Sequence, residues 1–216
     1  LIFINKMDRE RADFAHAVET VQKALSDKAV PITLPIGAES GFEGVIDLVT
    51  QKAHRFSEDG REVTSEAIPA SLQAAVNSAR EKLIEAVAAS DDDLMATFFD
   101  AGTLTDSELA DGLRQAVAAR QIYPVLCGSA ATNRGVQTLL DAIVQLVPPA
   151  AAGHSRSGKG KGDAEVQRSP KSTEPLSAYV FKMIPSEVGR MAMVRVISGK
   201  LTADSNVFNS THDKSE

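Results

Sequence analysis

Two short apolar runs constrain the fold most, because each ends at a small or polar turn that leads into a helical pattern. The first run is residues 1–4, before the turn at 5–8, and the second is residues 121–127, before the turn at 128–130. Such runs are typical of strands buried on both faces of a parallel sheet. We therefore expect an α/β fold whose turns lie at the carboxyl ends of the strands, where open parallel sheets bind ligands.

A helical pattern follows each turn. The first helix is expected to begin near Asp13, a residue type that caps helix N-termini, with Phe14 and Val18 on one face. The second helix is expected to end before Pro148, because proline cannot continue a helix. Its apolar positions form one wide stripe that consists of Val136, Leu139, Leu140, Ile143, Val144 and Val147.

The two strand-turn-helix patterns are separated by a long stretch. We expect this stretch, at residues of about 37–118, to form an inserted α+β subdomain. Pro31 and Pro35 confine the first strand of this region to a sheet edge or to an irregular strand. A mostly helical section is expected over residues 71–120, and Thr105 to Glu108 matches a capping box within it. The three predicted strands are residues 31–39, 44–49 and 52–56.

The composition changes beyond the second helix. Residues 148–175 are rich in Gly, Ser, Lys and Pro and predict a flexible linker. Within it, residues 153–159 fit the core of a phosphate-binding loop, but Gly160 follows where Ser or Thr would bind Mg²⁺, and no strand or helix pattern flanks it, so we reject that site. Residues 176–216 alternate and predict the first strands of an antiparallel β-barrel, too few to close one. Both ends of the chain are therefore expected to be truncated.

Bulk properties exclude several classes of protein. A net charge of -6 and a pI near 5.3 argue against a protein that coats nucleic acid, which would need a basic face. The single cysteine, Cys127, excludes an internal disulfide and fits a reducing compartment. No apolar run approaches the roughly 20 residues that span a bilayer. We expect a cytoplasmic protein that binds neither membranes nor DNA directly.

The first turn carries groups suited to reading a guanine base. A carboxylate such as Asp8 accepts two parallel N–H bonds, and guanine offers this pair at N1 and its exocyclic amine. Adenine lacks both donors, so it would leave an acceptor of Asp8 unpaired. Lys6 can lay its stem along a base face, and Asn5 can tie the turn to a neighbouring loop.

The second turn favours the same base. The small residues at 128–130 let the main chain approach a ligand closely, and a backbone N–H there can donate to guanine O6, where adenine carries an amine. Each turn alone is also compatible with an ordinary strand-to-helix connection. Two complementary turns in one sheet favour guanine recognition.

Two other features are interpreted as structural. Cys127 has no evident base partner and is expected to be a small buried thiol rather than a nucleophile. Asp91, Asp92 and Asp93 are expected to begin a helix, where they interact favourably with its dipole, rather than to bind a cation.

Four stretches match motifs of one known family. Asn5-Lys6-Met7-Asp8 resembles the fourth guanine-nucleotide motif of GTPases, Asn-Lys-x-Asp, and Gly128-Ser129-Ala130 resembles the fifth. Residues 36–56 are similar to the start of a subdomain inserted between these motifs in elongation factor G, a translational GTPase, and residues 189–201 are similar to the opening of its β-barrel domain II. The resemblance covers nearly the whole chain except the linker.

The resemblance implies a domain organisation. It implies the C-terminal part of a GTP-binding domain, built as a parallel-sheet GTPase fold, followed by a linker and the start of a truncated barrel domain. The corresponding ranges are 1–147, with the inserted subdomain at about 37–118, then 148–175 and 176–216.

The resemblance also implies roles for single residues. Asn5, Lys6 and Asp8 would hold the guanine of GTP or GDP, and Ser129 and Ala130 would close over it. The family's phosphate-binding loop, switch threonine and Mg²⁺-binding segment precede the fourth motif. We therefore expect an internal fragment that holds no catalytic residue or metal ligand and does not hydrolyse GTP alone.

For the intact parent protein, the resemblance implies GTP hydrolysis coupled to translocation on the ribosome, with the inserted subdomain contacting the ribosomal stalk. Other ribosome-associated GTPases remain open: a divergent paralogue, a release factor or a ribosomal protection protein. Two further alternatives are a non-catalytic interaction module with a relic guanine site and an unrelated α/β enzyme whose turns imitate the motifs.

Overall fold

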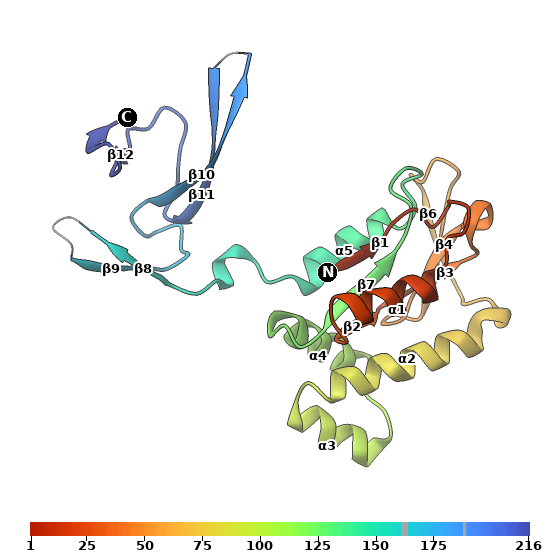
Figure 1. Cartoon of the computed structure of the whole chain (residues 1–216). Helices are drawn as coiled ribbons and strands as arrows, with labels where there is room; N and C mark the ends of the chain where they lie inside the picture. The colour runs from red at the N-terminus through yellow and green to blue at the C-terminus, as the bar shows by residue number, and fades with distance from the viewer. Residues whose placement is uncertain (161–163, 188) are drawn as a thin grey trace. The chain divides into compact units, whose positions relative to one another are not determined.

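The computed structural model describes residues 1–160, 164–187 and 189–216. The chain divides into two compact units, Leu1–Val147 and Pro148–Glu216, whose course is drawn in Figure 1. Within the described ranges, no helix is long and apolar enough to cross a membrane.

A three-stranded parallel sheet with the order β1-β7-β2 runs through the first unit. Its strands are β1 (Ile2–Ile4), β7 (Tyr123–Cys127) and β2 (Ala29–Pro31). β1 and β7 pair in parallel with Ile4 opposite Cys127, which confirms the two predicted strands and their shared sheet. The full burial expected of both strands holds for most of β7, whereas all three residues of β1 are only partly buried, because β1 lies at the edge of this sheet. The sequence did not indicate β2, because its three residues are too few to show a pattern.

One helix covers each face of this sheet: α1 (Phe14–Ala24) and α5 (Val136–Leu146). Successive side chains of a strand point to opposite faces. Val125 and Cys127 accordingly belong to a core with the buried residues of α1, whereas Leu126 belongs to a core with the buried residues of α5. The first unit is thus an α/β domain of the predicted class.

The inserted region begins with a four-stranded antiparallel sheet of order β3-β4-β5-β6. Pro35 lies in the edge strand β3, opposite Val45, as the sequence predicts for a proline-containing strand. β6 was not predicted, because all four of its residues are exposed and show no apolar alternation. The strands are β3 (Thr33–Ile36), β4 (Gly44–Asp47), β5 (Lys52–Phe56) and β6 (Val63–Glu66).

Three helices follow, and the predicted starts of the second and third are confirmed. Thr105 and Glu108 form both bonds of a capping box at the start of α4. Asp91 caps α3 by accepting hydrogen bonds from two backbone N–H groups, and Asp13 caps α1 in the same way through one. The helices are α2 (Gln73–Ala88), α3 (Asp92–Ala101) and α4 (Asp106–Ala118), with short 3₁₀ turns at η1 (Glu39–Gly41), η2 (Ala70–Leu72) and η3 (Ala150–Ala152).

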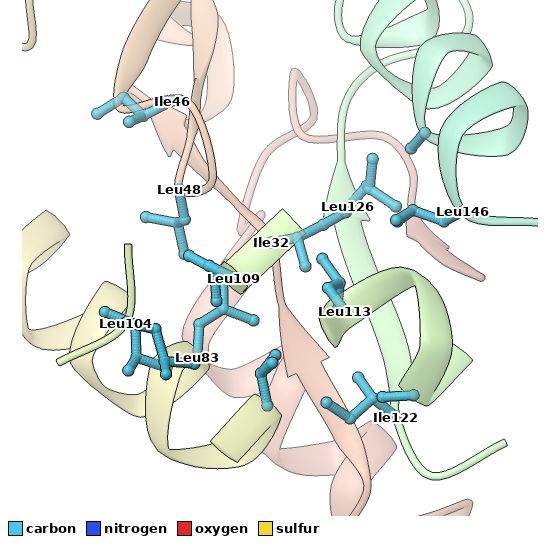
Figure 2. Close-up of a cluster of buried hydrophobic side chains, with 14 of the residues drawn as sticks. Ile32, Ile46, Leu48, Leu83, Leu104, Leu109, Leu113, Ile122, Leu126 and Leu146 are labelled. Carbon is cyan, nitrogen blue, oxygen red and sulfur yellow. The ribbon is translucent and has the colours of Figure 1, made fainter. Parts of the chain in front are cut away.

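The inserted helices and the parallel sheet share one hydrophobic core, shown in Figure 2. Leu83 of α2 and Leu113 of α4 belong to the same buried cluster as Leu126 of β7 and Leu146 of α5. Because the core is continuous, the insertion and the sheet form a single compact unit rather than two independently packed bodies.

Much of the predicted apolar stripe on α5 is exposed within this unit. The helix buries Ala142 and Leu146, whereas 55% of Leu140, 41% of Ile143 and 83% of Val144 remains accessible. The stripe therefore lies largely on the side of α5 that faces away from the shared core.

The described part of the second unit contains three antiparallel strand pairs, and one of them lies where the sequence predicted a linker. Residues 148–175 were expected to be a flexible linker, but the structure forms a β-hairpin there, with residues 161–163 of the predicted linker lying outside the described part. Main-chain pairing rather than apolar burial holds this hairpin together, so its composition gave no signal. The pairs are β8 (Arg156–Lys159) with β9 (Glu165–Arg168), β10 (Ser177–Ser186) with β11 (Gly189–Ser198), and β12 (Phe208–Asn209) with β13 (Lys214–Ser215).

Two sequence interpretations of this unit have different outcomes. The phosphate-loop pattern at residues 153–159 ends in strand β8, consistent with its rejection. The start of a β-barrel at residues 176–216, of which Val188 lies outside the described residues, stays a prediction.

We expect the shared core to dominate the stability of the first unit. Leu113 is 1% exposed, so Leu113→Ala should lower the free energy of unfolding by about 2–5 kcal/mol through lost burial and a residual cavity. Leu25→Ala is the matched control, because Leu25 is 75% exposed and should change stability by less than about 0.5 kcal/mol. Urea unfolding followed by circular dichroism measures both, and similar losses in the two variants would contradict the assignment of the core.

Candidate functional site

The two predicted turns lie side by side at the carboxyl ends of β1 and β7. Main-chain hydrogen bonds join them: Met7 N–H donates to Gly128 O at 3.1 Å, and Gly128 N–H donates to Ile4 O at 3.1 Å. Because parallel neighbours end at the same sheet edge, residues far apart in the chain meet here.

Asn5 ties the turns together through its side chain. Its Oδ1 accepts hydrogen bonds from the N–H of Ala130 at 2.9 Å and from the N–H of Lys6 at 2.8 Å. The predicted link from Asn5 to a neighbouring loop is thereby confirmed. Lys6 is exposed and adopts φ 66°, a left-handed conformation that is uncommon outside glycine and that clusters at ligand-binding turns.

Asp8 holds an acceptor that the protein itself does not satisfy. Its Oδ1 is buried and has no hydrogen-bond partner among the described residues, and Oδ2 lies 3.7 Å from Arg9 Nε. The hydroxyl of Ser129 is the main influence that holds the pKa of the Asp8 carboxyl below its ordinary value, with smaller contributions from the positive charges of Arg9 and Arg134. Asp8 is therefore an ionised, acceptor-only group at neutral pH.

Gly128 is required by close approach of its neighbours. A Cβ at this position would lie 2.5 Å from Arg134 O and 2.7 Å from Cζ of Phe3. Any larger residue would push the second turn away from β1. The sequence analysis predicted that this small residue lets a ligand approach closely. In the structure, Gly128 also lets the main chain of Arg134 approach closely.

Ser129 is buried and Ala130 is exposed, and the backbone N–H of each donates to an acceptor within the protein. Ser129 is fully buried, and its hydroxyl acts on the Asp8 carboxyl. The N–H of Ser129 donates to Arg134 O at 2.8 Å, and the N–H of Ala130 donates to Asn5. Ser129 would therefore act on a bound base through Asp8, and donation from this turn to guanine O6 stays a prediction.

These groups fit a guanine base. The ionised Asp8 carboxylate, with its buried Oδ1, matches the paired donors at guanine N1 and the exocyclic amine. The exposed Lys6 has an apolar stem that can cover a base face. As a metal site, in contrast, the described residues contain no group of three or more His, Cys, Asp or Glu side chains placed to hold an ion.

A cavity of about 660 Å³ adjoins the first turn at Met7, which contributes to its lining. Arg11, Phe14, Glu39 and Val76 are also among the lining residues, whereas Asn5, Lys6 and Asp8 are not. The cavity is therefore separate from the candidate base-reading site.

Two residues that contact the turns from outside them were not predicted from the sequence. Glu39 bonds to the first turn, and Arg134 bonds the second turn to the inserted region. The single-sequence pattern held no signal for either, because each contact involves a main-chain group that only the folded insertion brings close.

Known proteins resemble this chain in sequence and in fold. Residues 1–149 match the family described as the elongation factor Tu GTP binding domain. Among solved structures, a protein of Thermus thermophilus is similar over 97% of this chain, with a TM-score of 0.76 and 24% sequence identity, a likeness that shows the fold alone. This chain spans 29% of the length of that protein.

Cys127 is expected to be unreactive in the folded protein. It is 1% exposed, as predicted for a structural thiol, and burial raises its pKa to about 12. The reactive thiolate should therefore be scarce below that pH, and iodoacetamide at pH 8 should leave the native protein unlabelled but label one site per chain in urea. Mass spectrometry counts the adducts, and rapid labelling of the native protein would contradict the structural role.

Proposed function

The chain belongs to the family of the elongation factor Tu GTP-binding domain, and on that premise we propose that it forms the guanine-recognising part of an elongation factor G-like translational GTPase. In this proposal Asn5, Lys6 and Asp8 hold the base of GTP or GDP, and Ser129 and Ala130 complete the site. Membership of this family supports binding of a guanine nucleotide. The proposal of an elongation factor G-like protein draws on the two turns and on the region inserted between them.

The observation that carries the proposal is the buried Oδ1 of Asp8, which has no partner among the described residues. A buried acceptor left unpaired costs free energy, and guanine N1–H or its amine would remove that cost. Adenine offers no donor to this atom. The same oxygen thus supports both binding and discrimination.

The intact protein would couple GTP hydrolysis to translocation on the ribosome in the cytoplasm. The residues described in this chain would recognise the guanine base. Other parts of the protein would bind the phosphates and Mg²⁺ and activate the water. The inserted helices would be the contact with the ribosomal stalk. A ribosome-stimulated GTPase assay on the intact protein tests this wider role, and GTP hydrolysis that ribosomes leave unchanged would reject it.

We expect Asp8→Asn to weaken GDP binding by about 100-fold, because the amide has a single acceptor oxygen and its NH₂ opposes the guanine amine. The same change should improve binding of xanthosine diphosphate, which carries a carbonyl where guanine carries that amine. Titration of the intact protein with a fluorescent GDP analogue, with ADP and xanthosine diphosphate as competitors, measures all three affinities.

Asp27→Asn is the matched control, because Asp27 is exposed and lies outside both turns. It should bind GDP like the unaltered protein. Equal displacement of the fluorescent nucleotide by ADP and GDP, or unchanged GDP affinity in Asp8→Asn, would reject the base-reading role.

A further inference from the structure

The inserted region contacts the first turn through Glu39. The N–H of Glu39 donates to Met7 O at 3.0 Å, and its carboxylate Oε1 accepts from the N–H of Arg11 at 2.8 Å. Glu39 therefore bridges two points of the chain on either side of Asp8. Its own backbone is left-handed, with φ 54°, so the surrounding contacts hold it in an uncommon conformation.

The same region contacts the second turn through Arg134. Arg134 Nη1 donates to Phe42 O at 2.5 Å, while the main chain of Arg134 exchanges two hydrogen bonds with Ser129, at 2.8 and 3.0 Å. Phe42 is fully buried, and its N–H donates to Glu39 O at 3.0 Å. The guanidinium of Arg134 thus anchors the turn to a rigid point of the insertion.

A second part of the insertion supports this anchoring. Gly60, at the turn between β5 and β6, accepts through its carbonyl from Asn133 Nδ2 at 3.0 Å and from Gln137 Nε2 at 2.7 Å. A Cβ on Gly60 would lie 2.2 Å from Thr132 O, so the two backbones are in close contact. The second turn is therefore held at two places.

One short segment contacts both base-reading turns. Residues 39–42, which we name the clamp segment, bond to Met7 and Arg11 at one end and to Arg134 at the other. From this arrangement we infer that the clamp segment sets the spacing of the two turns, with Glu39 and Arg134 as positioning residues for guanine recognition. This inference rests on the proposed function and names how that site is held and regulated.

A coupling between the insertion and the nucleotide follows. The clamp segment lies between β3 and β4 of the inserted sheet, so a shift of that sheet moves both turns relative to each other. A partner that binds the insertion in one conformation changes guanine affinity, and a bound nucleotide changes the partner's affinity by the same factor. Glu39 and Arg134 transmit this effect without touching the base.

The test uses fluorescent GDP titrations of the intact protein, which give both the dissociation constant and the number of sites. Glu39→Ala removes the acceptor for Arg11 N–H, and Arg134→Gln removes the guanidinium that reaches Phe42. Each should raise the Kd for GDP by about tenfold while the number of sites stays near that of the unaltered protein. Glu39→Gln keeps the acceptor oxygen and should restore the affinity.

Arg114→Gln is the matched control. Arg114 lies in α4 of the insertion, where it pairs with Asp111 at 2.9 Å and contacts neither turn. It should leave the Kd unchanged. A merely structural role for Glu39 and Arg134 would lower the number of sites at constant Kd, and that result would overturn the inference.

The outcomes separate this inference from the proposed function. If the unaltered protein binds ADP as well as GDP, the proposed function fails and the clamp inference fails with it. If the unaltered protein prefers GDP and Asp8→Asn weakens binding, but Glu39→Ala and Arg134→Gln bind GDP with Kd values within about twofold of it, only the clamp inference is overturned. Equal losses in Glu39→Ala and Glu39→Gln would likewise overturn the hydrogen-bond assignment of Glu39.

Discussion

β1 and β7 are parallel neighbours, and the whole candidate site depends on that pairing. It sets Ile4 opposite Cys127 and allows Asn5 to accept a hydrogen bond from Ala130, a residue 125 positions away in the chain. Parallel strands cannot be joined by a tight turn and need a long crossover. In this chain the crossover contains the entire inserted region, so the segment that separates the two turns in sequence is also the one that connects them in space.

The insertion stabilises the sheet as well as linking its strands. It shares the buried cluster that reaches from Leu83 to Leu126, and Thr33 Oγ1 accepts a hydrogen bond from Cys127 N–H at 3.1 Å at the point where β2 passes into β3. Pairing between distant strands gains its stabilisation only after the entropy of loop closure has been lost. A crossover that folds onto the sheet and buries its own apolar face offsets that loss, which accounts for one compact unit rather than two.

The parts of the fold that the sequence predicted are those that local side-chain chemistry determines. Capping at Asp13, Asp91 and Thr105, the two apolar strands and the polar turns all follow from residue types at short spacing. β6 and the β8–β9 hairpin were missed because main-chain pairing forms them with little apolar burial. Glu39 and Arg134 were missed for a related reason, since their partners are main-chain groups brought near only by tertiary folding.

The site stores unfavourable free energy that the surrounding structure has to hold. The buried Oδ1 of Asp8 has no partner among the described residues, and the left-handed backbone of Lys6 costs at least about 1 kcal/mol. Without a rigid frame, the turn would relax by moving Asp8 into water. The hydrogen bonds that Asn5 accepts and Glu39 donates oppose that relaxation, so the same contacts that keep the turn strained also hold the Asp8 carboxylate in place.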